Sequence, residues 1–338
     1  MSERFAGALV GFGAVAEHAH LPAYRSHPRL VLRAVVEPDA HRRARARERL
    51  GGEVRLFPDL ASLLGEWRPA FLDVAAPPAG HAEAIARAAE AGVHVLVEKP
   101  LARTLAEAER ALEATRRAGT VLVTVHNWHY APAVRAARAA VAAGAVGIPR
   151  EVSFVTERSQ PAGGTGSWRL DVKTAGGGVL VDHGWHQLYL ARRLLGGADP
   201  LGVCARVERR RWHAASVEDT VKCQVRFAGG ARAELHLSWA SERRRTQVTL
   251  RGSAGELRLE DGALLRVSHG REEAWPAPPD APDDSWHASW FPPVLDAFAE
   301  ALACPERAAE NRREAELCQR MIDAAYRSSA AGGAEIQL

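Results

Sequence analysis

A short glycine-rich turn near the start of the chain constrains the fold more than any other feature of the sequence. The apolar run from Phe5 to Val10 leads into a G-x-G-x-x-A turn, which opens a segment of helical character. Gly11 permits the tight turn, Gly13 has no Cβ to keep a pyrophosphate from the main chain, and Ala16 lets the helix pack closely on the strand. The N–H groups at the start of such a helix can face an anion. The stretch therefore predicts the beginning of a dinucleotide-binding fold.

An acidic residue at the expected distance strengthens this prediction. A second apolar run, Leu30 to Val36, ends in Glu37, 24 residues after Gly13 and close to the usual position of the acid that holds the adenine ribose hydroxyls. Two alternatives stay open: the glycine turn of an unrelated α/β protein, and a signal peptide in which Arg4 precedes an apolar stretch ending at Ala16. The pattern favours NAD binding. The predicted cofactor contacts in this part of the chain are Gly11, Phe12, Gly13, Ala14, Val15 and Glu37.

Composition and charge narrow the class of protein. The 338 residues are enough for two domains, and 47% hydrophobic and 25% charged residues are ordinary for a globular protein with a sizeable core. The formal net charge of +3 is scattered along the chain, which gives no support to nucleic-acid binding. No apolar run approaches the roughly 18 residues of a membrane span, so no membrane partner is expected. The four cysteines are far apart and lack ligand spacing, which predicts buried thiols in a cytoplasmic protein.

The order of predicted strands and helices divides the chain near residue 125. Up to that point strands alternate with helices, which predicts an α/β fold with a doubly wound parallel sheet of the Rossmann type over residues 1–125. Beyond it, consecutive strands joined by glycine turns predict an α+β domain over 126–338 with a large, mainly antiparallel sheet. We expect Pro22 to bend or end the first helix early and Asp39 to cap the second.

The individual elements follow from hydrophobic periodicity and from turn residues. The predicted strands are 5–10, 31–36, 71–75, 93–97, 121–125, 151–157, 203–210, 220–227, 231–239, 246–252, 256–260 and 264–268. The predicted helices are 14–27, 39–50, 59–66, 79–91, 105–118, 131–143, 179–195, 292–303 and 308–328. Because helices are apparent for only one face of the second sheet, we expect its other face to pack on a second subunit, in a homodimer or a homotetramer.

A lysine at the end of a predicted strand is the first candidate for chemistry. Of 44 Lys and Arg residues only three are lysines, so a lysine can mark a place where a guanidinium cannot substitute. Lys99 lies in Glu98-Lys99-Pro100, at the carboxyl end of the strand 93–97, where ligands of open α/β sheets collect. An ammonium there can stabilise an alkoxide-like transition state. The alternative is a Glu–Lys surface pair before a turn.

A triple glycine followed by an acid and a histidine is the second candidate. After Gly176-Gly177-Gly178, Asp182 and His186 stand four residues apart, so on a regular helix they share one face with Cβ atoms about 6 Å apart. This pair suits an imidazole that accepts a proton and a carboxylate that orients it or binds a neighbouring hydroxyl. It could equally be a helix-stabilising pair or half of a metal site. No metal is predicted, because no further His or Cys follows at ligand spacing.

Taken together, these motifs resemble one oxidoreductase family: the glucose-fructose oxidoreductases, inositol dehydrogenases and rhizopine-catabolism proteins (Gfo/Idh/MocA). The resemblance covers nearly the whole chain, in the family's order. It rests on Gly11-Phe12-Gly13, Pro77-Pro78 with His81, Glu98-Lys99-Pro100, Asn127-Trp128-His129-Tyr130-Ala131-Pro132 and the run from Gly176 to His186. The resemblance implies that Lys99, Asp182 and His186 are the catalytic set, with His186 as the base, and that the Lys99-Pro100 bond is cis. It also implies that Pro77, His81, Glu98 and Asn127 contact the cofactor.

Two positions depart from the family, and a few others are candidates for substrate contacts. Tyr189 stands where many relatives carry an acid three residues after the histidine, and His129 stands where many carry an arginine. Both departures bear on the substrate more than on the reaction type. The candidate substrate contacts are His129, Trp168, Arg169 and Lys173, for which a solvated loop is the alternative. Asn127 could reach the nicotinamide or the substrate.

The predicted function is an NAD-dependent dehydrogenase that acts on a secondary alcohol of a sugar, a cyclitol or a derivative. Glu37 favours NAD over NADP because a carboxylate repels a 2′-phosphate, while Arg42 and Arg43 keep NADP open. Two alternatives remain. One is the same fold with tightly bound, recycled NAD, used for glycoside cleavage or internal redox exchange. The other is a non-catalytic sensor that binds a dinucleotide and a partner protein.

Overall fold

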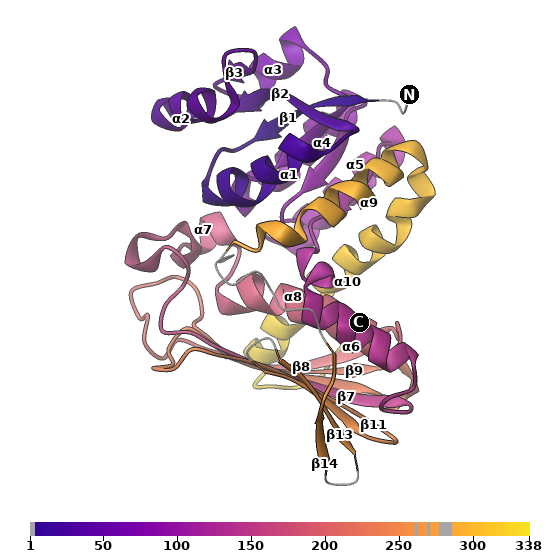
Figure 1. Cartoon of the computed structure of the whole chain (residues 1–338). Helices are drawn as coiled ribbons and strands as arrows, with labels where there is room; N and C mark the ends of the chain where they lie inside the picture. Colours follow the sequence, from indigo (N-terminus) through magenta and orange to yellow (C-terminus); the bar gives the residue numbers. More distant parts are fainter. Residues whose placement is uncertain (1–3, 261–262, 269–270, 277–285) are drawn as a thin grey trace. The chain divides into compact units, whose positions relative to one another are not determined.

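The computed structural model describes residues 4–260, 263–268, 271–276 and 286–338 (Figure 1). The chain forms two compact units, each made of two stretches of sequence. Unit 1 comprises residues 1–127 and 283–316, and unit 2 comprises residues 128–282 and 317–338. The predicted division near residue 125 lies close to the point after Asn127 where the chain passes from unit 1 to unit 2. The predicted continuous domain 126–338 differs from unit 2, because residues 283–316 group with unit 1. No helix among the described residues is long and apolar enough to cross a membrane.

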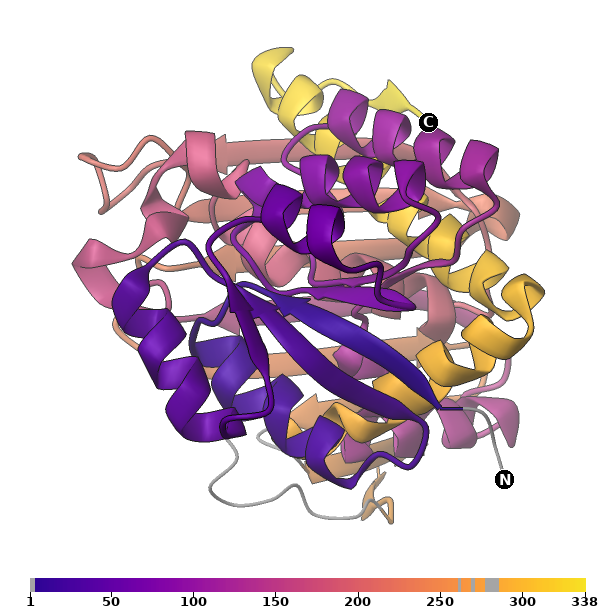
Figure 2. The ribbon, with the colours of Figure 1, turned by 90° about the horizontal axis from the view of Figure 1, so that it is seen from above.

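Unit 1 is built on a parallel sheet of six strands in the order β3-β2-β1-β4-β5-β6. The strands are β1 (Phe5–Val10), β2 (Leu30–Val36), β3 (Arg55–Phe57), β4 (Phe71–Val74), β5 (His94–Val97) and β6 (Leu122–Thr124). Helices cover both faces of the sheet (Figure 2). This confirms the doubly wound Rossmann arrangement. The sequence did not reveal β3, because three residues are too few to show a period of two.

Three helices of unit 1 begin at capping residues. The helices of this unit are α1 (Leu21–Ser26), α2 (Ala40–Leu50), α3 (Leu60–Glu66), α4 (His81–Glu90), α5 (Leu105–Ala118), α9 (Pro292–Ala303) and the first part of α10 (Ala309–Ala330). Asp39, Asp59 and Thr104 each accept a hydrogen bond from the N–H three residues later, at the starts of α2, α3 and α5. Pro22 does not end the first helix early. Residues 14–15 and the π-helical segment Ala16–His20 lead without a break into α1, which continues past Pro22 to Ser26.

Aromatic contacts explain why α9 belongs to unit 1. Phe298 is fully buried, and its ring meets the ring of Phe71 in β4 edge to face, with centroids 5.4 Å apart. Phe291, directly before α9, stacks on the ring of His20 at 3.9 Å. Burial of rings of this size contributes several kcal/mol, so this segment completes the core of the dinucleotide-type domain.

Unit 2 contains a sheet of nine strands in the order β14-β13-β12-β11-β7-β10-β9-β8-β15. The strands are β7 (Pro149–Glu157), β8 (Pro200–Glu208), β9 (Thr220–Phe227), β10 (Arg232–Ser238), β11 (Arg245–Gly252), β12 (Glu256–Glu260), β13 (Ala263–Ser268), β14 (Arg271–Ala274) and β15 (Ile336–Gln337). Every pairing is antiparallel except that of β7 with β10. The mainly antiparallel sheet is thus confirmed, and the short strands β14 and β15 are additions to it.

The two faces of this sheet differ in polarity. Along β7 the side chains of Val152, Phe154 and Thr156 are buried, whereas Ser153 and Val155 on the other face are partly exposed. The helices α6 (Pro132–Ala142) and α8 (Trp185–Leu194) lie on the buried face (Figure 1). The opposite face, here called the open face, carries polar side chains from four strands. They include Ser153, Arg206, Lys222, Gln224, Glu234 and His236.

Candidate active site

The glycine turn of unit 1 has the shape that a pyrophosphate requires. Gly11 has a φ of 89°, and a Cβ there would lie 2.8 Å from the backbone nitrogen of Ala76, so only glycine fits. A Cβ on Gly13 would meet nothing within 4 Å, which leaves open space beside the main chain. The turn leads into a π-helical segment, Ala16–His20, and then into α1. The residues present therefore fit a dinucleotide at this turn.

Glu37 is tied to the same turn. Its side chain is buried, Oε2 accepts a hydrogen bond from the N–H of Phe12 at 2.8 Å, and Oε1 accepts one from the N–H of Asp39 at 3.0 Å. A carboxylate oxygen can accept more than one hydrogen bond, so Glu37 can also hold a ribose hydroxyl. Arg43 donates to the carbonyl oxygens of Glu37 and Pro38. The acid thus organises the turn in addition to the role that the sequence predicts for it.

A buried cluster of charge joins the helix after this turn to the strands β4 and β5. His20 donates from Nδ1 to Asp73 Oδ2 at 2.8 Å and from Nε2 to Glu98 Oε1 at 3.0 Å. Burial alone lowers the pKa of His20, but the charges of Asp73 and Glu98 and the hydrogen bonds to them raise its pKa to about 9. For Glu98, burial by itself would raise the pKa. The hydrogen bond and charge of His20 and the charge of Lys99 have the larger effect, so the pKa of Glu98 lies below its usual value. The imidazole is therefore charged at neutral pH.

Lys99 follows this cluster directly. Glu98 Oε2 accepts the N–H of Lys99 at 3.1 Å, and the Lys99-Pro100 peptide bond is cis, as the resemblance implies. His81 is fully buried, and its ring nitrogens lie 2.8 Å from the carbonyl oxygens of Pro100 and Ala76. The ring of His81 thus holds the loop of Lys99 to the loop after β4. The structure does not test its predicted contact with the cofactor.

Parallel strands bring the remaining predicted residues of unit 1 to one edge of the sheet. The carboxyl ends of all strands in a parallel sheet lie at the same edge. The turn of Gly11 follows β1, Glu37 follows β2, Pro77 follows β4, Lys99 follows β5 and Asn127 follows β6. Five separate sequence motifs therefore meet where ligands of such folds bind.

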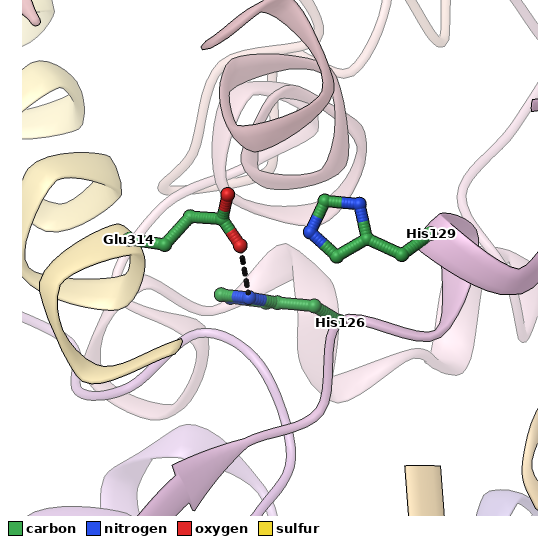
Figure 3. A group of neighbouring side chains, drawn as sticks. All are labelled: His126, His129 and Glu314. Atoms are coloured by element: carbon green, nitrogen blue, oxygen red, sulfur yellow. Dashed lines mark hydrogen bonds and ion pairs between the residues drawn. The ribbon is translucent and has the colours of Figure 1, made fainter. Parts of the chain in front are cut away.

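The loop that carries Asn127 is held by residues that sequence reasoning missed. Asn311 in α10 accepts the N–H of Thr124 at 2.8 Å and donates to its carbonyl oxygen at 2.9 Å. One turn later in α10, Glu314 accepts a hydrogen bond from Nδ1 of His126 at 3.1 Å (Figure 3). Both partners of this pair are buried. No local pattern could reveal them, because almost 190 residues separate them.

In unit 2 the helix of Asp182 and His186 begins irregularly. The structure has a π-helical turn at Leu180–Gly184 and then α8, where the sequence predicts one regular helix over 179–195. A π-helical turn changes which side chains share a face, so the predicted i, i+4 geometry does not apply through Asp182. Such turns are frequent at functional sites.

Tight packing explains the triple glycine that precedes this turn. A Cβ on Gly177 would lie 2.0 Å from the hydroxyl oxygen of Tyr326, and one on Gly178 would lie 1.9 Å from the backbone oxygen of Glu218. The carboxylate of Glu218 accepts hydrogen bonds from the N–H groups of Gly178 and Leu180 at 2.9 and 3.0 Å and from the hydroxyl of Tyr326 at 3.0 Å. Burial raises the pKa of Glu218 against these bonds. Glu218 therefore anchors the start of the Asp182 helix.

One of the candidate substrate residues, Arg169, lies beside Asp182. Arg169 Nε is 3.6 Å from Asp182 Oδ1, and the guanidinium of Arg169 lies 4.3 Å from the ring centroid of Trp168. His183 Nε2 is 3.9 Å from the other carboxylate oxygen of Asp182. Lys173, in contrast, is exposed on the short helix α7 (Val172–Ala175). Within unit 2 the structure thus brings Arg169 to Asp182, with Trp168 packed on the guanidinium of Arg169.

Aromatic residues surround His186. Its Nδ1 lies 2.9 Å from Tyr189 Oη, and the ring of Trp128 stacks on the imidazole with centroids 4.9 Å apart. The N–H of Trp128 donates to the same Tyr189 oxygen at 3.1 Å. The ring of His129 lies 4.5 Å from the ring of Tyr189. These four residues, Trp128, His129, His186 and Tyr189, are called the His186 cluster below.

The fold and these residues define a dinucleotide-binding oxidoreductase with a second α+β unit. Residues 5–126 match the model of the oxidoreductase family with an NAD-binding Rossmann fold, and residues 134–258 match the GFO/IDH/MocA C-terminal domain. The chain belongs to the Gfo/Idh/MocA family of NAD-binding oxidoreductases.

Named relatives and solved structures agree with this assignment. D-apiose dehydrogenase of Paraburkholderia graminis is 31% identical over 286 residues, 82% of this chain and 74% of the relative. Levoglucosan dehydrogenase of Pseudarthrobacter phenanthrenivorans is 28% identical over 78% of this chain and 74% of the relative. An oxidoreductase from Agrobacterium radiobacter, crystallised with NAD+, L-tartaric acid and magnesium, has the same fold, with a TM-score of 0.88 at 21% identity over 99% of this chain and 98% of that chain.

The buried His20 predicts a specific dependence of stability on pH. Because the folded-state pKa of about 9 lies above the unfolded value near 6.5, His20 stabilises the fold fully below pH 6.5 and loses this contribution between pH 6.5 and 9. We expect the free energy of unfolding of the wild type to fall by up to about 3 kcal/mol more than that of His20→Gln across this range. Urea unfolding at pH 6, 7.5 and 9 measures the difference. The exposed-site variant His213→Gln should follow the wild type, and parallel pH profiles for the wild type and His20→Gln would contradict the assignment.

Proposed function

We propose that this protein is a dehydrogenase that oxidises a secondary alcohol of a sugar, a cyclitol or a related derivative with NAD. The observation that carries the proposal is the meeting of the phosphate turn, Glu37 and Lys99 at one edge of the unit 1 sheet. The His186 cluster of unit 2 supports the proposal, because it contains an imidazole whose Nδ1 is hydrogen-bonded to the hydroxyl of Tyr189. The named relatives support the substrate class, since their names give two sugars, D-apiose and levoglucosan, as the compounds on which they act.

Each predicted catalytic residue has a distinct task in this reaction. When bound, NAD accepts a hydride from the carbon that bears the hydroxyl. Nε2 of His186 takes the hydroxyl proton, and the ammonium of Lys99 stabilises the negative charge that develops on the oxygen. Asp182, with Arg169 beside it, binds neighbouring hydroxyls of the substrate and orients the ring. These roles for Lys99, Asp182 and His186 are proposals from the family motif and the local geometry.

The proposal is tested by a screen of pentoses, hexoses, anhydrosugars and inositols with NAD, followed by the absorbance of reduced nicotinamide. With an active substrate, Lys99→Met and His186→Gln should each lower kcat by about 10²-fold or more, because each removes charge stabilisation or proton transfer. His213→Gln, at an exposed histidine of unit 2, is the matched control and should keep wild-type kcat. Full activity of both Lys99 and His186 variants would contradict the proposed mechanism.

We infer that NAD is preferred over NADP. The charge of Glu37 sits at the end of β2, held by the N–H groups of Phe12 and Asp39, and would repel a 2′-phosphate. Arg43 donates hydrogen bonds to backbone carbonyl oxygens of the same loop, so its positive charge lies close to Glu37. We expect kcat/KM of the wild type to be higher with NAD than with NADP. Glu37→Gln should lower the ratio of kcat/KM with NAD to kcat/KM with NADP. A wild-type preference for NADP would contradict the role of Glu37.

We also propose that the open face of the unit 2 sheet packs on a second copy of the chain. Charges of both signs lie on it: Arg232 is bound to Glu151, and Lys222 and Glu234 lie on the same face, so a two-fold axis can pair the face with itself. Light scattering should give a mass of at least twice 36.5 kDa. Ser153→Arg, which adds bulk at the middle of the face, should shift the mass toward the monomer. A monomeric wild type would contradict this proposal.

A reducing compartment fits the cysteines. All four, Cys204, Cys223, Cys304 and Cys318, are free thiols. Burial, with the nearby Cys204, raises the pKa of Cys223 to about 12, which leaves this thiol unreactive. We therefore infer a cytoplasmic location.

A further inference from the structure

One ring nitrogen of His186, Nδ1, is paired with the phenol of Tyr189. Nδ1 of His186 and Oη of Tyr189 are 2.9 Å apart, and both side chains are almost completely buried, at 6% and 0% exposure. Trp128 stacks on the imidazole, so the ring plane is fixed from one face as well as from Nδ1. The sequence alone marked Tyr189 only as a departure from the acid that many relatives carry.

The backbone N–H of Trp128 determines the direction of one hydrogen bond at the Tyr189 oxygen. A backbone N–H can only donate, so Tyr189 Oη accepts the bond from Trp128 at 3.1 Å. The oxygen retains a second lone pair for Nδ1–H of His186. A neutral imidazole has a single N–H, and Nε2 can accept a substrate proton only while that hydrogen is on Nδ1. A basic Nε2 therefore requires that the Tyr189 oxygen accept, and not donate, the hydrogen bond at Nδ1.

We propose that Tyr189 is the positioning residue that keeps the hydrogen of neutral His186 on Nδ1 and so leaves Nε2 ready to take the substrate proton. This inference rests on the proposed function. In the reaction, the O–H and C–H bonds of the alcohol break and a carbonyl forms. The proton moves to Nε2, the hydride moves to NAD, and the resulting imidazolium keeps its Nδ1–H bonded to the phenol oxygen until Nε2 releases the proton to solvent.

A phenol and a carboxylate differ in what they do to the imidazolium. A neutral phenol supports a charged imidazole less than a carboxylate at the same place would. Other titratable groups of unit 2 close to His186 in space or in sequence include His129, whose ring contacts Tyr189, and Asp182, four residues earlier. Asp182 is paired with Arg169 and His183, so its charge is partly balanced. The group that accepts the hydrogen bond from Nδ1 therefore influences the pKa of the His186 imidazole.

Two substitutions at Tyr189 separate these effects. Tyr189→Phe removes only the oxygen, and Tyr189→Glu restores a charged acceptor. Nitrogen-15 NMR of the full-length protein without cofactor, with the His186 signals assigned by their loss in His186→Gln, gives the titration midpoint and the site of the hydrogen. We expect the midpoints to rise in the order Phe, Tyr, Glu, with steps of about one pH unit. The signal of a hydrogen on Nδ1 should dominate in the wild type and decline in the Phe variant.

Kinetics provide the second readout. For alcohol oxidation, the pH at which kcat/KM reaches half its maximum should shift in the same order as the NMR midpoints. Tyr189→Phe should lower kcat about tenfold or more, with KM for NAD unchanged. His213→Gln, at an exposed histidine of unit 2, is the control: it should leave kcat and the pH midpoint unchanged.

The outcomes distinguish this inference from the proposed function. Equal midpoints and equal placement of the hydrogen in all three proteins would overturn the role of Tyr189, whatever the enzyme oxidises. If the Glu variant does not fold, the Phe variant decides alone, since an unchanged midpoint and kcat would also overturn the role. If no polyol reduces NAD, the proposed function fails, while the NMR titration still tests whether Tyr189 places the hydrogen on His186.

Discussion

A charged imidazole buried between two carboxylates is the interaction on which unit 1 depends. His20 belongs to the helix that follows the phosphate turn, Asp73 belongs to β4, and Glu98 precedes the lysine at the end of β5. Removing one member would leave uncompensated charge in the core, which costs several kcal/mol. The cofactor turn and the loop of Lys99 are therefore fixed relative to each other by one set of hydrogen bonds.

Unit 2 uses a buried carboxylate for the same purpose. Glu218 accepts hydrogen bonds from two N–H groups at the irregular start of the helix that carries Asp182 and His186. The hydroxyl of Tyr326 donates to Oε1 of the same carboxylate. Because Gly178 lies against the backbone of Glu218, no side chain can enter between them. In both units, then, residues proposed for catalysis stand next to groups whose positions are determined by buried charge. Such rigid support is what precise proton transfer requires.

The sequence was informative where function requires a local pattern. The phosphate turn, the motif of Lys99 and the triple glycine are contiguous, so their residue types and spacing could be recognised. The parallel and antiparallel sheets followed from the order of strands and helices. His20 and Glu218 were missed because their partners are 53, 78 and 40 residues away in the chain. The return of residues 283–316 to unit 1 was missed for the same reason, since contacts such as Phe298 with Phe71 leave no local signal.

In the proposed mechanism, the amine of Lys99 and the imidazole of His186 act on the same substrate hydroxyl. A crystal structure of the protein with NAD and a polyol that it oxidises tests this claim most directly. The account predicts that Lys99 Nζ and His186 Nε2 both lie within about 3 Å of the same substrate oxygen. A complex in which the two nitrogens contact different hydroxyls, or in which His186 faces away from the reacting carbon, would contradict it.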